Sequence, residues 1–247
     1  MTTTAQNRPP ALADLTAASL LDRRVLILDR ELDQDNGAQL CSQLILLAAE
    51  RPDRDITLLI NSPGGLVPAM LAIGDLMTLL PCDVRTVALG MAYSAGQFLL
   101  TQGAPGKRYI LPHGKVLMHQ GSAGFGGSAA DIEIQAEDLR RNRDLLIRLT
   151  AARTGRSVEQ IARDSERDRM WDAQEAVAYG FCDAVLSDLA QILPGRGPSG
   201  DDLSPADRRD PAGFSAATPA ASDRPEASTR PAERPEPRPE TTTEESR

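Results

Sequence analysis

Ser94 is the residue whose type and setting first suggest catalysis in this sequence. It lies in Gly90-Met-Ala-Tyr-Ser94-Ala-Gly96, where a strand pattern passes through small residues into a helix pattern. A serine at such a junction points its hydroxyl away from the end of a sheet, and the following N–H faces an incoming oxygen. The same position is also typical of a simple helix N-cap. The usual hydrolase turn has Gly at position 92, where this chain has Ala.

A nucleophilic serine needs a general base within hydrogen-bond reach, because its own pKa lies far above 7. The chain has only two histidines. His119 ends the apolar run VLMHQ, whereas His113 follows Pro112 in a turn pattern, so His119 is the stronger candidate. A triad also needs an acid that fixes the imidazole tautomer. Spacing alone leaves four acids open: Asp164, Glu166, Asp168 and Asp172.

The segment Asn61-Ser-Pro-Gly-Gly65 follows a strand pattern directly. Its glycines let the backbone turn tightly and leave N–H groups unobstructed, which suits an oxyanion or a phosphate. Taken alone, the motif is more typical of an ordinary turn.

The elements that must position these residues alternate between strand and helix patterns. The expected strands are Val25–Asp29, Ile56–Asn61, Val84–Leu89, Arg108–Leu111 and Lys115–His119. The expected helices are Asn36–Glu50, Val67–Leu80, Ser94–Thr101 and Asp131 to about Thr154, with a cap at Gly155 and capping boxes at Ser157/Gln160 and Asp172/Glu175. This alternation predicts an α/β fold with mainly parallel strands.

Composition predicts one domain between two flexible segments. Residues 1–17 have a loose, polar composition, and residues 18–190 carry the strand and helix patterns. From Pro194 to Arg247 the chain is rich in Pro, Ser, Glu and Arg, and such a segment cannot bury enough apolar surface to offset its ordering entropy. We therefore expect a disordered tail over 194–247.

Charge and composition exclude several classes of function. The formal net charge of −8 disfavours nucleic acid and anionic membrane as partners. No apolar run approaches the ~18 residues that span a bilayer. The three cysteines, Cys41, Cys82 and Cys182, are widely spaced, which predicts small buried side chains and no metal-ligand spacing. The sequence also has no Gly-rich nucleotide loop. We expect a cytoplasmic protein without a metal or cofactor.

Read in order, INSPGG, AYSAGQFLL, MHQ and SERDRMWDAQEAVAYGFCD resemble the proteolytic subunit of the bacterial Clp protease. The resemblance covers roughly 165–170 residues and implies a crotonase-like fold. It implies that Ser94 is the nucleophile, His119 the base and Asp168 the acid. The oxyanion hole would be the backbone N–H groups of Gly65 and Ala95.

The same resemblance implies a serine endopeptidase that hydrolyses unfolded polypeptides to short peptides inside two stacked seven-membered rings. A hexameric AAA+ unfoldase would feed the chamber and use the ATP. Gly121 replaces a proline that is common in the family, and with the glycine-rich segment after it this predicts more conformational freedom where relatives join the two rings. Where the family commonly has aromatic residues in the strand before NSPGG, which form pockets for the unfoldase, this chain has Thr57 and Leu59. We therefore expect a paralogous subunit to supply the unfoldase docking surface.

Three other interpretations remain open from the sequence. A crotonase-type acyl-CoA enzyme would share the glycine-based oxyanion hole without needing a Ser/His pair. A Ser-Lys peptidase would have to use Lys107 or Lys115, the only lysines. A catalytically weak or silent ring subunit would assemble with an active paralogue.

Overall fold

The computed structural model describes residues 12–121, 124 and 126–188. Its strands are β1 (Val25–Leu28), β2 (Ile56–Ser62), β3 (Val84–Tyr93), β4 (Arg108–Ile110), β5 (Lys115–Met118), β6 (Arg169–Trp171) and β7 (Ala184–Val185). Its helices are α1 (Leu12–Leu21), α2 (Gln34–Glu50), α3 (Val67–Leu79), α4 (Ala95–Gln102), α5 (Ala129–Thr154), α6 (Val158–Asp164) and α7 (Ala173–Tyr179). The expected α/β alternation is confirmed in the described residues.

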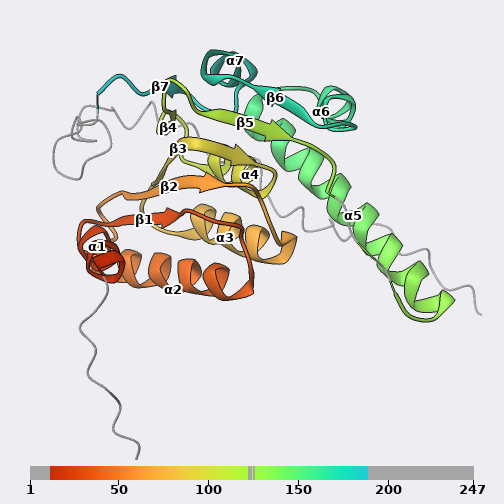
Figure 1. Cartoon of the computed structure of the whole chain (residues 1–247), viewed down its shortest axis with the longest axis horizontal. Helices are drawn as coiled ribbons and strands as arrows, with labels where there is room; N and C mark the ends of the chain where they lie inside the picture. The colour runs from red at the N-terminus through yellow and green to blue at the C-terminus, as the bar shows by residue number, and fades with distance from the viewer. Residues whose placement is uncertain (1–11, 122–123, 125, 189–247) are drawn as a thin grey trace, which may run out of the picture. The chain divides into compact units, whose positions relative to one another are not determined.

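The strands form one sheet with the order β1-β2-β3-β4-β7, and β5 pairs with both β3 and β6. Every pair is parallel except β5–β6. The long strand β3 changes its neighbour along its length. Its first half pairs with β4, and its last residues pair with β5. The carboxyl end of β3 therefore lies beside the carboxyl end of β5, as Figure 1 shows.

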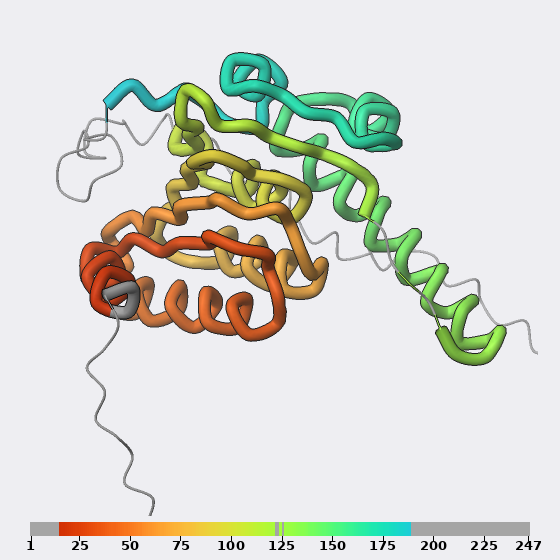
Figure 2. Tube along the Cα trace, in the orientation of Figure 1, coloured from red at the N-terminus to blue at the C-terminus, as the bar shows by residue number. Residues whose placement is uncertain are grey.

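Helices α2 and α3 pack side by side against the sheet, and α4 lies behind the end of β3 (Figures 1 and 2). Alternate residues of β2 point to this side, as the period of two in a strand requires. The main hydrophobic core joins these strand residues to apolar residues of the helices: Ile56, Leu58, Ile60, Leu44, Met70, Ile73 and Leu99.

The other face of the sheet is only thinly covered. A small cluster there has Val87 and Leu186 at its centre, with Leu59 and Tyr109 among its partly buried members. Ile27 of β1 is 36% exposed. This face therefore differs from the helix-covered face, because several of its apolar side chains remain in contact with solvent.

Helix α5 is the longest helix among the described residues, and its N-terminal half extends away from the sheet (Figures 1 and 2). All of its buried residues, Ile147, Thr150 and Ala151, lie in the C-terminal half. Ser128 begins α5 with a capping box, and Gly155 ends it in the left-handed conformation at φ 70°. The expected glycine cap is thus confirmed.

Several expected boundaries differ in detail from the structure. Helix α1 begins at Leu12, inside the segment 1–17 that composition marked as flexible, and the short strands β6 and β7 were not expected. The capping box at Asp172/Glu175 is confirmed, whereas Ser157 caps α6 without the reciprocal bond from Gln160. The predicted tail over 194–247 lies outside the described residues.

The three cysteines are free thiols; Cys82 and Cys182 are buried, and Cys41 is partly buried. Across residues 12–121, 124 and 126–188, no helix is both long enough and apolar enough to cross a membrane.

Candidate active site

Ser94 is the single residue between β3 and α4. Its φ of 53° and ψ of −113° are unusual for a residue with a side chain, and such backbone strain costs on the order of 1–3 kcal/mol. Two backbone bonds hold it there: Ser94 N donates to Leu117 O at 2.8 Å, and Phe98 N donates to Ser94 O at 3.0 Å. The Ser94 side chain makes no cap hydrogen bond to α4. The hydroxyl is therefore not used as an ordinary helix cap.

Strand register brings His119 to the same place. Tyr93 is paired with Leu117 across the parallel β3–β5 ladder, so Ser94, which follows β3, lies next to Met118, the last residue of β5. His119 comes directly after β5. Its neighbour Gln120 donates a 2.7 Å hydrogen bond from its backbone N–H to Ser165 O, which anchors this end of β5 to the loop after α6.

Asp168, the residue directly before the antiparallel strand β6, reaches His119. Met118 pairs with Arg169 in that ladder, which places Asp168 opposite His119. The distance from His119 Nδ1 to Asp168 Oδ1 is 3.2 Å. The His119 side chain is 29% exposed and the Asp168 side chain 75% exposed. The contact is the one that a triad uses to fix the imidazole tautomer and leave Nε2 available to the nucleophile.

The other candidate acids have different partners. Asp164 pairs with Arg169 and accepts a 2.7 Å hydrogen bond from the Tyr179 hydroxyl. Asp172 accepts from Glu175 N at 2.9 Å as the N-cap of α7. Glu166 is exposed and lies in the turn after α6. Among the four acids left open by spacing, only Asp168 contacts His119 in the described residues.

The glycine turn after β2 lies against Ser94. The β2–β3 ladder pairs Ser62 with Ala92 after a register shift, which carries the turn to the end of β3. A Cβ on Gly64 would lie 2.8 Å from Ser94 Cβ, and one on Gly65 would lie 2.0 Å from Leu32 O. Both glycines have positive φ, 120° and 141°. No larger residue fits at either position without moving the backbone.

The expected oxyanion donors both have unused N–H groups within the described chain. Gly65 lies beside Leu32 in an isolated parallel bridge. The two hydrogen bonds of this bridge run from Leu32 N to Gly64 O and from Leu66 N to Leu32 O, and Gly65 N donates to no group in the described chain. Ala95 is the first residue of α4, and the first N–H groups of a helix have no acceptor within the helix. The dipole of α4 adds partial positive charge at the same end. Both groups could therefore stabilise an oxyanion.

The proposed nucleophile, base and oxyanion donors all line one cleft. It is lined by Ser94, Gly65, Ala95 and His119. Apolar side chains from α3, α4 and α5 also line it, among them Met70, Phe98, Leu146 and Ile147. In the described structure no hydrogen bond joins Ser94 Oγ to His119; such bonds are often long before substrate binds. The wall from α5 was not expected from the sequence, because no local pattern shows which helix face a distant strand end meets.

The remaining histidine and the lysines lie elsewhere. His113 is exposed in the turn between β4 and β5. Lys107 is paired with Asp55 at 2.6 Å and with Asp83 at 2.8 Å. Lys115 begins β5, at the opposite end of that strand from His119. Since neither lysine lines the cleft, the geometry disfavours a Ser-Lys peptidase.

Residues 12–121, 124 and 126–188 contain no group of three or more His, Cys, Asp or Glu side chains that could hold a metal ion.

Comparison with known proteins places the chain in a family. A family model described as Clp protease matches residues 11–188. The chain belongs to the Clp protease family. It is 52% identical over 180 residues to the ATP-dependent Clp protease proteolytic subunit 2 of Nocardia farcinica (strain IFM 10152), covering 73% of this chain and 89% of that protein.

Two further relatives carry similar names. Over 181 residues the chain is 49% identical to the ATP-dependent Clp protease proteolytic subunit 3 of Streptomyces coelicolor (strain ATCC BAA-471 / A3(2) / M145), covering 73% of this chain and 83% of that protein. Over 178 residues it is 49% identical to subunit 1 of Corynebacterium jeikeium (strain K411), covering 72% and 95%. The family resemblance read from the sequence is thus confirmed. The fold is the crotonase-like α/β fold of Clp proteolytic subunits.

Proposed function

We propose that this Clp family chain is a serine endopeptidase that uses Ser94, His119 and Asp168 as its triad. The observation that supports this best is the 3.2 Å contact between His119 Nδ1 and Asp168 Oδ1 at the strand end beside Ser94. The unused N–H groups of Gly65 and Ala95 are the proposed oxyanion hole. The reaction is acyl transfer from a peptide to Ser94, followed by hydrolysis.

The proposed chemistry follows from the roles of these groups. Ser94 Oγ forms a bond to the peptide carbonyl carbon while its proton passes to His119 Nε2. The carbonyl oxygen becomes an oxyanion that accepts from the two backbone N–H groups, and losing one such donor typically costs ~10²–10³ in rate. The imidazolium, stabilised by Asp168, then protonates the leaving amine. Water attacks the acyl-enzyme with His119 again as base, and the second product leaves as a carboxylate.

We propose that the chain acts in the cytoplasm in two stacked seven-membered rings and receives unfolded polypeptides from a hexameric AAA+ unfoldase. The names of its relatives describe them as subunits of an ATP-dependent protease, which supports a partner that uses the ATP. The mechanism above needs no metal or cofactor, since a serine, an imidazole and backbone donors supply every step.

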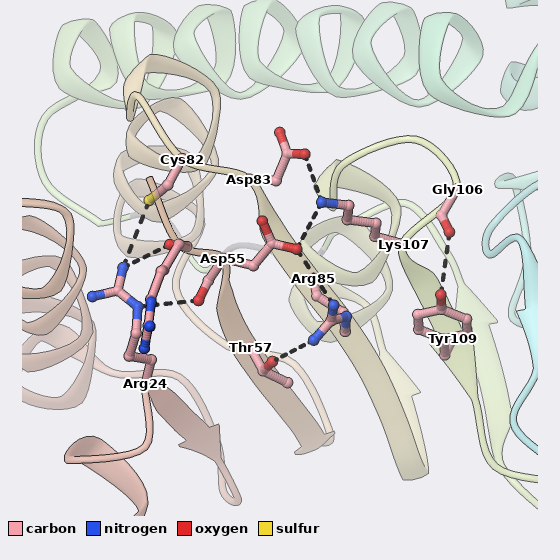
Figure 3. Close-up of polar contacts among 10 residues, drawn as sticks. Arg24, Asp55, Thr57, Cys82, Asp83, Arg85, Gly106, Lys107 and Tyr109 are labelled. Carbon is pink, nitrogen blue, oxygen red and sulfur yellow. Dashed lines mark hydrogen bonds and ion pairs between the residues drawn. The ribbon is translucent and has the colours of Figure 1, made fainter. Parts of the chain in front are cut away.

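A paralogous subunit is the proposed source of the unfoldase docking surface. Thr57 is buried, and its hydroxyl accepts a 3.3 Å hydrogen bond from Arg85. Figure 3 shows this pair beside Asp55, which also binds Arg85 and Lys107. Of the two positions where the family commonly has aromatic side chains, Thr57 belongs to this polar network and Leu59 to the small apolar cluster around Val87 and Leu186. Neither position offers an aromatic ring, and aromatic rings contribute strongly to binding at interfaces.

Labelling with a fluorophosphonate tests the triad. We expect the purified chain, alone or mixed with a paralogous subunit, to be labelled at Ser94, with the modified residue located by mass spectrometry. Absence of labelling under every mixing condition would instead favour the silent ring subunit. Thr57 and Leu59, which stand where the family commonly has aromatic residues, are the observation that favours this second function.

The paralogue proposal has its own test. We expect rings of this chain alone to hydrolyse small peptides but not to degrade a folded substrate with an unfoldase and ATP. Unfoldase-driven degradation of that substrate by such homo-oligomers would rule the proposal out.

A further inference from the structure

The cleft at Ser94 has two chemically different surfaces. Part of its lining is apolar: Met70 and Phe98 come from α3 and α4, and Leu146 and Ile147 come from α5. The outer part of the α5 wall carries Arg140, Asn142 and Arg143. A substrate side chain that contacts the apolar lining would therefore meet hydrocarbon, while one that reaches Arg140 or Arg143 would meet a guanidinium group.

The two cleft arginines lie three residues apart on α5, so they share one face of the helix. Neither makes an ion pair in the described residues, whereas Arg141 between them pairs with Glu137. Arg141 does not line the cleft. Helix α5 therefore presents Arg140 and Arg143 to the cleft without a carboxylate partner in the described residues. Arg141, which does not line the cleft, is paired with Glu137.

No carboxylate opposes these cations from the other walls. Of the described residues that line the cleft, none is Asp or Glu, and His119 is the remaining titratable group. The proposed catalytic acid, Asp168, contacts His119 but does not line the cleft. The local charge of the cleft is thus positive, although the whole chain has a formal net charge of −8. Any attraction for acidic peptides must come from this local arrangement.

We propose that the cleft selects peptide segments that carry an acidic side chain close to an apolar residue at the scissile bond, and that Arg140 and Arg143 recognise the acidic side chain. This inference rests on the proposed peptidase function. A guanidinium group offers paired N–H donors that match a carboxylate. Because both arginines are exposed, the expected preference is moderate and depends on salt.

A set of internally quenched peptides tests the proposal. Each peptide keeps the same apolar residue before the scissile bond and carries Glu, Gln or Lys at the second, third or fourth residue before it. We expect kcat/KM to follow Glu over Gln over Lys at one of these positions, with Glu favoured over Gln about twofold to tenfold at low salt. Raising the ionic strength should reduce this ratio.

The variant R140Q/R143Q should bring the Glu-to-Gln ratio close to one, while the matched control R141Q should keep the wild-type ratio. The ratio is taken within each preparation, so a change in the fraction of assembled enzyme does not alter it. Equal hydrolysis of the Glu and Gln peptides by the wild type, or an unchanged ratio in R140Q/R143Q, would overturn the inference alone. Absence of Ser94-dependent hydrolysis for every peptide would overturn the proposed function and the inference together.

Discussion

Asp168 Oδ1 lies 3.2 Å from His119 Nδ1, although Asp168 is exposed and belongs to a different part of the chain. The contact depends on the short antiparallel ladder in which Met118 pairs with Arg169. That ladder continues the sheet beyond β5, so the same hydrogen bonds that complete the sheet also set the position of the proposed acid. Because Asp168 is the only one of the four candidate acids that contacts His119 in the described residues, a substitution at Asp168 should lower activity more than one at a neighbouring acid.

Asp168→Asn should lower kcat for peptide hydrolysis by roughly 10²–10⁴, because an amide in place of the carboxylate disfavours the productive tautomer of His119. The protein should remain folded, since Asp168 is exposed. Steady-state kinetics on a fluorogenic peptide measure the effect.

Asp172→Asn is the matched control for that substitution. Asn also serves as an N-cap, so α7 should persist and the rate should stay near that of the wild type. Equal losses in both variants would contradict the assignment of Asp168.

Gly65→Ala should lower both activity and melting temperature. A Cβ there would lie 2.0 Å from Leu32 O, so the turn must move and displace its N–H from the cleft. We expect a loss of at least about 10²-fold in kcat, the effect of removing one oxyanion donor.

Gly106→Ala provides the comparison, because Gly106 also has positive φ but its Cβ would meet nothing within 4 Å. It should cost only the backbone strain, roughly 1–2 kcal/mol, with kcat unchanged. Thermal unfolding and peptide hydrolysis of both variants test this pair. A Gly65→Ala enzyme with wild-type kcat would exclude that N–H from catalysis.

Local sequence patterns predict most of the elements and several of the side-chain roles. Apolar runs locate β1 to β5, and Gly155 locates the end of α5, because these features depend on neighbours in the sequence. The short strands β6 and β7 were missed, since two or three residues carry no periodicity. Spacing also left four acids open; the β5–β6 pairing, which is a long-range contact, distinguishes Asp168.

Local sequence patterns also could not predict which residues line the cleft. Arg140 and Arg143 look like an ordinary solvated helix face in the sequence, and only the packing of α5 against α4 and α6 places them in the cleft that Ser94 also lines. The strain at Ser94 was also hidden, because a non-glycine residue gives no warning of positive φ.

Asp55→Asn should destabilise the protein by about 1–3 kcal/mol, because it removes a charge that two cations share. Asp55 is 29% exposed and contacts both Lys107 and Arg85. Asp53→Asn removes a carboxylate that pairs with Arg51 at the surface, and it should leave stability nearly unchanged. Urea unfolding of the two variants makes the comparison. A larger loss for Asp53→Asn would contradict the role assigned to the network.

Cys182 should resist alkylation in the native protein. Burial raises the pKa of its thiol to about 12, which keeps it neutral and unreactive near pH 8. Because the thiol has a higher pKa in the folded state than in the unfolded state, its protonated form favours folding. This contribution to stability is complete below the unfolded pKa near 9 and is lost as the pH rises from there through the folded pKa of about 12. Iodoacetamide at pH 8 should modify the partly exposed Cys41 first. Mass spectrometry that found Cys182 modified before Cys41 would refute this.

The central claim is that Ser94 is a nucleophile, and hydrolysis of a small fluorogenic peptide tests it most directly. The purified chain, alone and mixed with a paralogous subunit, is compared with its Ser94→Ala variant in the same mixtures. We predict that the wild-type chain contributes hydrolysis that the variant lacks, leaving only the background of the paralogue. Equal rates from the two chains in every mixture, or no hydrolysis at all, would contradict the account and identify a ring subunit whose triad residues do not act.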